Sequence, residues 1–298
     1  MSNQPERNGR TSVLVLGTAQ WGNAYGITNA VGRLSDAEIA GIVSVAQSWG
    51  ISAVDTAAGY GDALARLQPW ADAFAITTKV AGADPAAMAE AMQSGLASLG
   101  RSSVETLLVH DWDALSDAVR PDVVNELGAL LESGVVQAVG VSVYSEDEVA
   151  AARSAFLMGG VPLGAVQVPA NAIDRRLDNS QVLGDLALAG VRVQVRSAFL
   201  QGLLLGGSGA GSGSVAGGLG AHPDVLAFQA AAMGAGLSPL AYALRHVHAL
   251  PWATEIVVGV TSGAELDAIA TAWQTTAELA PESLASRDLE LLDPRRWA

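Results

Sequence analysis

An aspartate, a tyrosine, a lysine and a histidine in this sequence could together carry out acid–base chemistry. They are Asp55, Tyr60, Lys79 and His110. Lys79 is the only lysine among sixteen basic residues, and its compact amine can change its pKa on desolvation or form a Schiff base, which an arginine cannot do. A tyrosine is a poor acid at neutral pH, but a lysine ammonium beside it favours the phenolate, and an aspartate keeps that lysine charged. A histidine can hydrogen-bond the same substrate oxygen. The set therefore predicts a site that protonates a carbonyl oxygen while hydride reaches its carbon, or the reverse.

Three of these residues directly follow short apolar runs that are typical of buried strands. The runs cover 51–54, 74–78 and 104–109. They end next to Asp55, Lys79 and His110. In a parallel barrel these side chains converge at the carboxyl ends of the strands. Tyr60 lies five residues beyond Asp55, far enough along the chain to turn back over the same end.

Strand segments alternate with longer helical segments along the whole chain. Strands are expected near 12–17, 51–55, 74–79, 104–109, 135–141, 164–168, 191–196 and 255–260. Helices are expected near 35–49, 61–71, 85–99, 114–133, 145–158, 178–189, 223–248 and 262–277. Eight strand–helix units of this spacing predict the α/β class and a single (β/α)8 TIM barrel. Periodicity alone leaves an open, doubly wound sheet as an alternative.

Local signals mark where several helices should begin and end. Segments 35–38 and 145–148 have the pattern of a capping box. Glycines stand where four helices should stop before the next strand, at Gly50, Gly100, Gly134 and Gly190. The barrel is expected to occupy 12–298, after a polar tail at 1–11.

One segment departs from this alternation. Residues 206–220 consist almost entirely of glycine, serine and alanine and follow the seventh expected strand. The glycine spacing does not fit a dinucleotide-binding fingerprint. The segment is either a mobile insertion or a strap that folds over a cofactor at the catalytic end of the barrel.

Composition excludes several classes of partner. Half of the 298 residues are hydrophobic and the formal net charge is −14, which argues against nucleic acid or an anionic membrane as a partner. There is no cysteine, and the start of the chain lacks the apolar core of an export signal. The uncharged stretch 225–244 is interrupted at 236–239 by a helix stop and a new helix start, so two packed helices near 223–235 and 239–248 are expected. We therefore predict a cytoplasmic protein with no membrane span.

Eight segments carry a resemblance to a known family. They include 16–22 (Leu-Gly-Thr-Ala-Gln-Trp-Gly), 55–61, 78–80, 108–110, 139–142, 166–168, 196–202 and 256–260. In this order and spacing the chain resembles the aldo-keto reductase superfamily. The resemblance implies that Tyr60 donates the proton, that Lys79 modulates the acidity of Tyr60, and that Asp55 is the partner of the lysine. It also implies that His110 orients the substrate and that the reaction needs no metal.

The resemblance further implies a nicotinamide cofactor. Ser142 and Gln167 would hold its carboxamide, and the other residues implied in cofactor binding are Thr18, Ala19, Arg196, Ser197, Phe199, Gln201, Gly202, Gly259, Val260, Thr261 and Ser262. NADP(H) is the first choice on family grounds, with NAD(H) as the alternative. Segment 259–265 lacks the lysine or arginine that relatives direct at the 2′-phosphate, so the preference for NADPH should be weak. An arginine such as Arg192 or Arg245 would restore it if the fold brought it near.

The substrate is expected to be a small carbonyl compound or a sugar-like molecule. Trp21, Trp112 and Tyr144 follow strands one, four and five, where they would either line a substrate pocket or simply pack in the core. Two other functions remain open: a Schiff-base lyase that uses Lys79 as nucleophile, and a cofactor-binding scaffold or sensor with little turnover. His246 and His248 stand two residues apart on a helix, so they do not share a face and are poor joint metal ligands. The sequence does not specify the oligomeric state.

Overall fold

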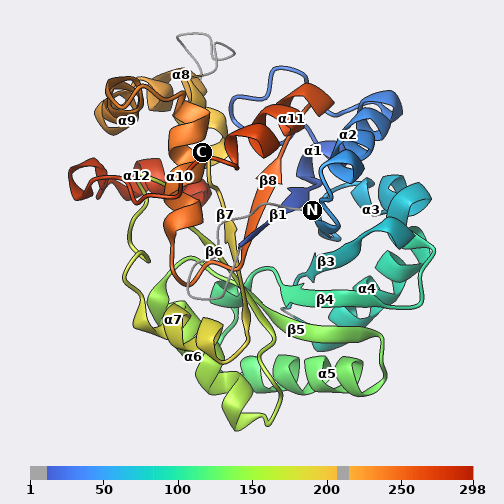
Figure 1. Cartoon of the computed structure of the whole chain (residues 1–298). Coiled ribbons are helices and arrows are strands. Elements are labelled where there is room, and N and C mark those ends of the chain that lie inside the picture. Colours follow the sequence, from blue (N-terminus) through green and yellow to red (C-terminus); the bar gives the residue numbers. More distant parts are fainter. Residues whose placement is uncertain (1–11, 83, 207–214, 298) are drawn as a thin grey trace.

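The computed structural model describes residues 12–82, 84–206 and 215–297. Within these ranges eight parallel strands close into a barrel in sequence order, and helices surround it (Figure 1). The predicted (β/α)8 barrel is thus confirmed. The polar tail predicted at 1–11 lies outside the described residues.

The strands begin and end close to the apolar runs in the sequence. They are β1 (Val13–Gly17), β2 (Ala53–Asp55), β3 (Ala75–Val80), β4 (Val104–Val109), β5 (Val136–Ser142), β6 (Ala165–Pro169), β7 (Arg192–Arg196) and β8 (Glu255–Gly259). Every residue of β6 is buried, as expected for a parallel strand covered on both faces. The first and last strands pair along their full length, from Val13 opposite Glu255 to Gly17 opposite Gly259. All carboxyl ends therefore meet at one end of the barrel.

The helices follow the strands as expected, with short 3₁₀ turns among them. The α-helices are α1 (Ala19–Gly22), α2 (Asp36–Ser48), α3 (Ala63–Leu67), α4 (Pro85–Leu99), α5 (Arg120–Glu132), α6 (Glu146–Met158), α7 (Gln181–Leu188), α8 (Val215–Gly220), α9 (Pro223–Gly234), α10 (Pro239–Ala249), α11 (Gly263–Ala272) and α12 (Leu289–Leu292). The 3₁₀ helices are η1 (Gln68–Ala73), η2 (Trp112–Ala114), η3 (Leu200–Leu205), η4 (Glu282–Leu284) and η5 (Pro294–Arg296).

The predicted helix signals are confirmed. Ser35 and Ser145 each form a complete capping box, with Glu38 and Glu148 at the third helical position. The four glycines expected at helix ends all have a positive φ, between 66° and 89°, which a glycine adopts without a steric penalty: Gly50, Gly100, Gly134 and Gly190.

Two helix boundaries differ from the sequence expectation because of prolines. The helix expected over 61–71 ends at Leu67 and continues as η1, in which Pro69 stands at the start. The helix expected over 114–133 begins only at Arg120, with Pro121 in its first turn. A proline lacks the N–H that a helix interior needs, so it is tolerated only in the first turn.

The glycine-rich segment is only partly described. Residues 215–220 form the short helix α8, so this part of 206–220 is not loop. Residues 207–214 lie outside the described residues.

Helices α9 and α10 confirm the two helices expected around 236–239. No single helix in the described ranges is long and apolar enough to cross a membrane, and these two would qualify by length and composition only as a pair bent by 96°.

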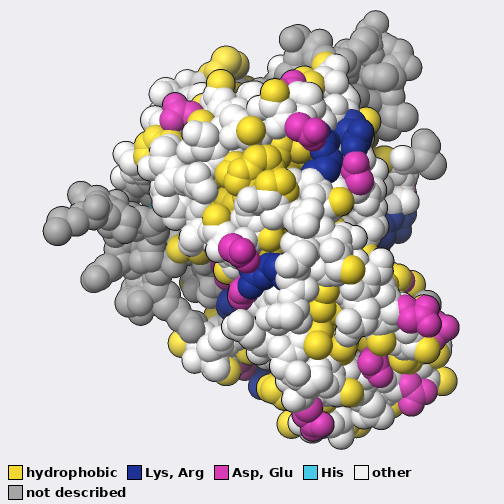
Figure 2. Space-filling model, turned by 90° about the vertical axis from the view of Figure 1, so that its right-hand side faces the viewer, with side chains coloured by type: hydrophobic (Ala, Val, Ile, Leu, Met, Phe, Trp, Pro, Cys, Tyr) yellow, Lys and Arg dark blue, Asp and Glu magenta, His cyan; other side chains and the backbone are white. Residues whose placement is uncertain are grey.

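On the face of the molecule shown in Figure 2, Lys and Arg side chains are few, and most lie against Asp or Glu.

A chain of polar side chains runs through the barrel interior. Gln194 accepts a hydrogen bond from Gln167 at 3.0 Å and donates to Thr77 at 3.2 Å and to Glu255 at 2.5 Å. Arg192, at the start of β7, lies 3.8 Å from Glu255. Polar side chains thus hydrogen-bond to one another inside the barrel, from its amino-terminal end up to Gln167 near its carboxyl end.

Candidate active site

Lys79 lies at the centre of the four predicted acid–base residues. Its Nζ donates to Asp55 Oδ1 at 2.6 Å, to the Thr56 carbonyl at 3.1 Å and to the Tyr60 hydroxyl at 3.4 Å. Both members of the ion pair are buried, with Lys79 1% and Asp55 3% exposed. Burial lowers the pKa of the Lys79 ammonium, but the charge of Asp55 and the nearby Tyr60 raise it by more, so the net pKa lies above its usual value. Lys79 is therefore a fixed cation.

The Asp55 carboxylate is held from both sides. While Oδ1 accepts from Lys79, Oδ2 accepts a hydrogen bond from Gln167 Nε2 at 2.7 Å. The backbone of Asp55 is also fixed, because its carbonyl accepts from the backbone N–H of Thr18 at 3.0 Å and from the Thr18 hydroxyl at 3.2 Å. This arrangement joins β1, β2, β3 and β6 at the carboxyl end of the barrel.

Tyr60 is positioned by a turn that packs against α1. Gly61 in this turn has φ +58°, and a Cβ there would lie 2.6 Å from the Gly22 carbonyl oxygen. A Cβ on Gly22 would in turn lie 1.8 Å from the Tyr60 carbonyl oxygen. Only glycines allow the two backbones to approach so closely, and the approach returns Tyr60 to Lys79.

His110 lies against Tyr60 at the rim of the site. The two rings meet edge to face, with centroids 5.9 Å apart and planes at 81°. Burial of the imidazole, and then the charge of Lys79, lower the pKa of His110 to about 4. The residue is nevertheless more than a third exposed, so solvent screens part of the effect of Lys79. His110 is a neutral imidazole at neutral pH.

A cavity of about 430 Å³ opens at this end of the barrel, and Asp55 and Tyr60 line it. Most of the residues implied in cofactor binding also line it: Thr18, Ala19, Gln167, Arg196, Ser197, Phe199, Gln201, Gly202, Gly259, Val260 and Thr261. The cavity runs from Tyr60 past β7 and β8 to the start of α11.

Six sequence-predicted site residues are not part of the cavity lining: Lys79, His110, Ser142, Ser262, Trp21 and Trp112. Lys79 contacts Asp55 and Tyr60, which do line it, and His110 packs against the Tyr60 ring. Ser142 is buried next to Gln167 across the β5–β6 pairing, and Ser262 caps α11 through the backbone N–H of Glu265. Trp21 and Trp112 are fully buried in the hydrophobic core. Trp21 packs against Trp70 and Trp112 against Phe156, so packing is the interpretation that their placement favours over substrate contact.

The segment that follows β7 has an unusual backbone. Ser197, Leu200 and Gln201 have φ of 61°, 48° and 52°, in the left-handed region that residues other than glycine seldom adopt. Strain of this kind persists where the surroundings impose it and is common at ligand sites. The three residues lie on the β7 side of the cavity, where Ser197 and Gln201 contribute to its lining.

A loop that the sequence reasoning missed covers this segment. The backbone N–H of Ile27 donates to Gln201 Oε1 at 3.1 Å, and the Thr28 hydroxyl donates to the Gln201 carbonyl at 2.9 Å. A Cβ on Gly202 would lie 2.0 Å from the Thr28 hydroxyl, so this contact also requires a glycine. The loop brings Tyr25 to the cavity. The sequence contained one signal for this loop: it follows the first strand, and the loops after the strands build the active sites of these barrels.

The cavity has features that fit a nucleotide cofactor. The side chain of Gln20 lines it, and within the described part of the chain its buried Oε1 has no hydrogen-bond partner. Across the cavity lie the backbones of Gly259 and Val260, next to the start of α11. An unsatisfied buried acceptor and a helix start beside open space suit a ligand with amide and phosphate groups.

Among the described residues, the far end of the cavity contains a carboxylate and no basic side chain. Glu265 accepts hydrogen bonds from the Thr261 backbone N–H at 2.7 Å and from the Thr261 hydroxyl at 3.0 Å. Arg192 lies at the opposite end of β7 beside Glu255, and Arg245 pairs with Glu278. Neither arginine lines the cavity, and among the lining residues the basic side chain is Arg196.

The histidines of α10 have structural roles. His246 is fully buried and accepts a hydrogen bond from the Ala280 backbone N–H at 3.2 Å, while His248 stacks on Trp273 at 4.2 Å between centroids. Throughout the described ranges, no group of three acidic or histidine side chains is arranged to hold a metal ion.

Comparison with known proteins gives a consistent family match. The model of the aldo/keto reductase family matches residues 13–288. An aldo-keto reductase of Mycobacterium marinum is 35% identical over 128 residues, which are 40% of this chain and 45% of that protein. The alignment thus spans less than half the length of that curated relative.

Solved structures agree in fold. A glycerol dehydrogenase from Gluconobacter oxydans superimposes with a TM-score of 0.70 at 19% identity, covering 93% of this chain and 90% of its own. A Pseudomonas aeruginosa protein assigned to the aldo-keto reductases gives 0.64 at 20% identity, covering 89% and 90%. At such identities the likeness establishes the barrel and nothing about the substrate.

Proposed function

This chain belongs to the aldo/keto reductase family, and on that basis we propose that it transfers hydride between a nicotinamide cofactor and a small carbonyl or sugar-like compound. In this proposal Tyr60 is the general acid in reduction and the general base in oxidation. Membership of the family implies NAD(P)H-dependent oxidoreduction.

The observation that carries the proposal is the contact of Lys79 Nζ with both the Asp55 carboxylate and the Tyr60 hydroxyl, at 2.6 and 3.4 Å. An ammonium fixed beside a phenol stabilises the phenolate that remains after the proton has moved to the substrate oxygen. Asp55 keeps the ammonium charged, and Gln167 keeps Asp55 in place. The proton would therefore pass between the Tyr60 hydroxyl and the carbonyl oxygen.

His110 would orient the substrate. A neutral imidazole can donate one hydrogen bond to a carbonyl oxygen and accept another elsewhere. Since its ring packs against the Tyr60 ring, both groups can reach the same oxygen. His110 adds no charge to the site at neutral pH, which leaves Lys79 as the cation next to the phenol.

The cofactor would lie along the cavity lining. Gln167 and Ser197 would contact the nicotinamide end, residues 201–202 the pyrophosphate, and Gly259 to Thr261 the adenosine end. A bound nicotinamide would supply or accept the hydride. On family grounds NADP(H) comes first, but the Glu265 carboxylate already occupies the N–H and hydroxyl of Thr261. We therefore infer a weak preference for NADPH, with NADH also supporting turnover.

The bonding of Lys79 argues against a Schiff-base lyase. A nucleophilic amine must be deprotonated and reach the substrate. The Lys79 pKa is raised, its Nζ is bound to Asp55 and Thr56, and its side chain is 1% exposed. A scaffold or sensor on this fold differs from the proposed enzyme in turnover only, so a measurement of turnover separates the two.

The test combines cofactor binding with turnover. Quenching of tryptophan fluorescence would measure the Kd of NADPH and of NADH, and a panel of small aldehydes, ketones and sugars would then be assayed by nicotinamide absorbance. We expect Tyr60→Phe to lower kcat by about 10² to 10⁴, the usual contribution of a general acid, with the cofactor Kd unchanged. Retention of more than a tenth of wild-type turnover would show that another group moves the proton.

A further inference from the structure

Arg196 places a positive charge at the cavity. It ends β7, lines the cavity that Tyr60 and Asp55 also line, and is partly exposed. Its side-chain hydrogen bond among the described residues runs to the Val143 carbonyl oxygen at 3.3 Å, a long contact with a neutral acceptor. Other arginines near this end of the barrel, such as Arg176 and Arg295, are paired with carboxylates. Within the described ranges no carboxylate compensates the Arg196 guanidinium.

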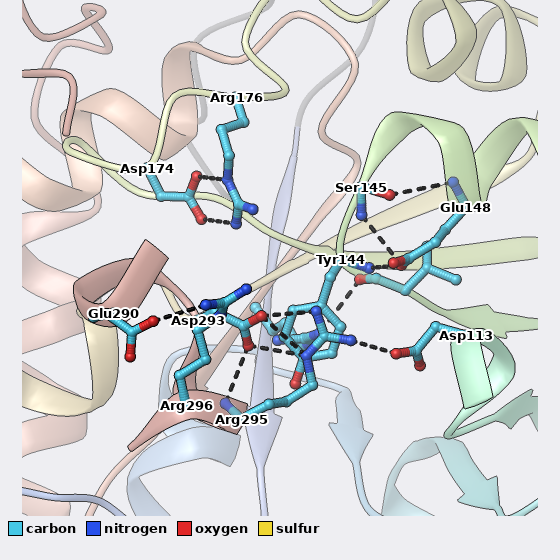
Figure 3. Close-up of polar contacts among 12 residues, drawn as sticks. Asp113, Tyr144, Ser145, Glu148, Asp174, Arg176, Glu290, Asp293, Arg295 and Arg296 are labelled. Atoms are coloured by element: carbon cyan, nitrogen blue, oxygen red, sulfur yellow. Dashed lines mark hydrogen bonds and ion pairs between the residues drawn. The ribbon is translucent and has the colours of Figure 1, made fainter. Parts of the chain in front are cut away.

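The guanidinium is held in place by an aromatic ring. Arg196 stacks on Tyr144 with its central carbon 4.1 Å from the ring centroid, and Arg295 stacks on the same ring at 3.7 Å. Arg295 comes from the C-terminal turn η5 and is bound by Asp293 and Asp113, as Figure 3 shows. Its charge is therefore cancelled. The stack fixes the plane of Arg196 without neutralising it.

Tyr25 adds a neutral donor to the same part of the cavity. Tyr25 lines the same cavity as Arg196 and Tyr60, and the residue is 43% exposed. Partial burial, and then the nearby Tyr60, raises the pKa of Tyr25 to about 12. The Arg196 charge lowers this pKa by a smaller amount, and both residues line the same cavity. Tyr25 thus stays protonated and can donate a hydrogen bond. The contacts of Ile27 and Thr28 with Gln201 fix the loop that carries it.

We propose that the substrate is a small carbonyl compound that bears a carboxylate, with the carboxylate bound by Arg196 and Tyr25 while Tyr60 and His110 receive the carbonyl oxygen. This inference rests on the proposed reductase function and specifies its substrate class. A planar guanidinium that has no carboxylate partner among the described residues matches the two oxygens of a carboxylate, and a phenol adds a third donor. The enzyme has a net charge of −14, so an uncompensated cation in its cavity is the feature that would admit an anion.

The same guanidinium could instead lie against the nicotinamide ring, because residues 196–202 also line the presumed cofactor path. The two roles differ in what a change at Arg196 does. A group that binds the substrate carboxylate changes the discrimination between charged and neutral substrates. Loss of a group that binds the cofactor lowers kcat/KM equally for charged and neutral substrates and raises the KM of the cofactor.

The test compares two aldehydes of nearly the same size, of which one is an anion and the other is neutral: 4-formylbenzoate and 4-formylbenzamide. We expect the wild type to favour the carboxylate in kcat/KM by about ten- to a hundredfold, the usual effect of a hydrogen-bonded charge. In Arg196→Gln this ratio should fall to within threefold of one, and Arg196→Lys should recover part of it. Arg153→Gln is the matched control, since it removes one positive charge from the half-exposed surface of α6 and should leave the ratio unchanged.

Three results would overturn the inference. They are a wild-type ratio within threefold of one, an unchanged ratio in Arg196→Gln, and equal losses for both aldehydes together with a raised cofactor KM. Failure of the proposed function is seen separately, as absence of turnover with either aldehyde and either cofactor. In that case titration calorimetry with benzoate and benzamide still tests the anion site. Tighter binding of benzoate that is lost in Arg196→Gln supports the site, and equal binding of the two compounds refutes it.

Discussion

The Glu265 carboxylate lies at the end of the cavity where the adenosine of the cofactor should bind, so its replacement tests the inferred cofactor preference. Glu265→Gln removes a negative charge and keeps the size of the side chain. In the wild type this carboxylate would oppose the 2′-phosphate of NADPH and compete with it for the N–H and hydroxyl of Thr261. NADH has no such phosphate. The substitution should therefore favour NADPH.

The size of the effect follows from the exposure of the site. Two unit charges about 4 Å apart interact by roughly 1 kcal/mol in water and by roughly 4 kcal/mol at an effective dielectric of about 20. Glu265 is exposed, so the lower part of this range applies. A gain of about 1–2 kcal/mol corresponds to a rise of about 5- to 30-fold in the ratio of kcat/KM for NADPH over NADH.

The assay is steady-state kinetics with both cofactors at low and high salt. The effect should shrink at high salt, because ions screen exposed charges. Glu38→Gln is a matched control: Glu38 accepts the same kind of capping hydrogen bond, from the Ser35 backbone N–H, but does not line the cavity. It should lower the Tm to a similar degree and leave the cofactor ratio unchanged.

Two outcomes would refute this reasoning. One is a cofactor ratio in Glu265→Gln within twofold of the wild type. The other is a wild-type preference for NADPH of a thousandfold or more, well above the roughly hundredfold that a single hydrogen bond to a charged group supplies. Such a preference would require a cation at the 2′-phosphate that the described cavity lining does not contain.

Three further predictions concern the acid–base residues and their support. Borohydride added to the enzyme with substrate should trap no adduct at Lys79. Lys79→Arg should still lose most activity, because a guanidinium does not fit the compact buried site. An adduct seen by mass spectrometry, or near-normal turnover of Lys79→Arg, would contradict the role of Lys79 as a fixed cation. The pKa of His110 is about 4 in the folded state and about 6.5 in the unfolded chain. As the pH falls from about 6.5 towards 4, the unfolded chain takes up a proton first, so the protein loses stability over this range. NMR titration of the ring should give the low pKa, and a midpoint near 6.5 would refute it. Gln194→Met should cost about 1–3 kcal/mol of unfolding free energy, because Gln167 and Glu255 lose a buried partner. Gln181→Met on the exposed start of α7 is its control in denaturant titrations, and equal stability of the two variants would mean that the polar chain in the barrel contributes nothing.

The barrel and the meeting of Asp55, Lys79 and His110 could be predicted because they depend on local pattern. A β-branched apolar run fixes a strand, and the residue after it must lie at the carboxyl end of the barrel. The direction of a side chain beyond that end is not fixed by the run. Trp21 and Trp112 follow strands as His110 does, yet both turn into the core, since packing partners distant in the chain decide their orientation.

Tyr25 shows why the remaining part of the site could not be read from the sequence. Its loop is held by hydrogen bonds to Gln201, which is 174 residues from Ile27, and Gln201 itself adopts a left-handed conformation that its residue type does not suggest. Neither fact has a signal within a short window of sequence. Arg196 is different, since its position at the end of β7 could be predicted but its lack of a carboxylate partner could not. Both Arg196 and Arg295 stack on Tyr144, and Asp293 and Asp113 pair with Arg295. We infer that Arg196 is the one available to an anion. Under the proposed anion site, the charge of the substrate would depend on which arginine lacks a carboxylate partner, and that depends on the C-terminal turn η5 as much as on β7.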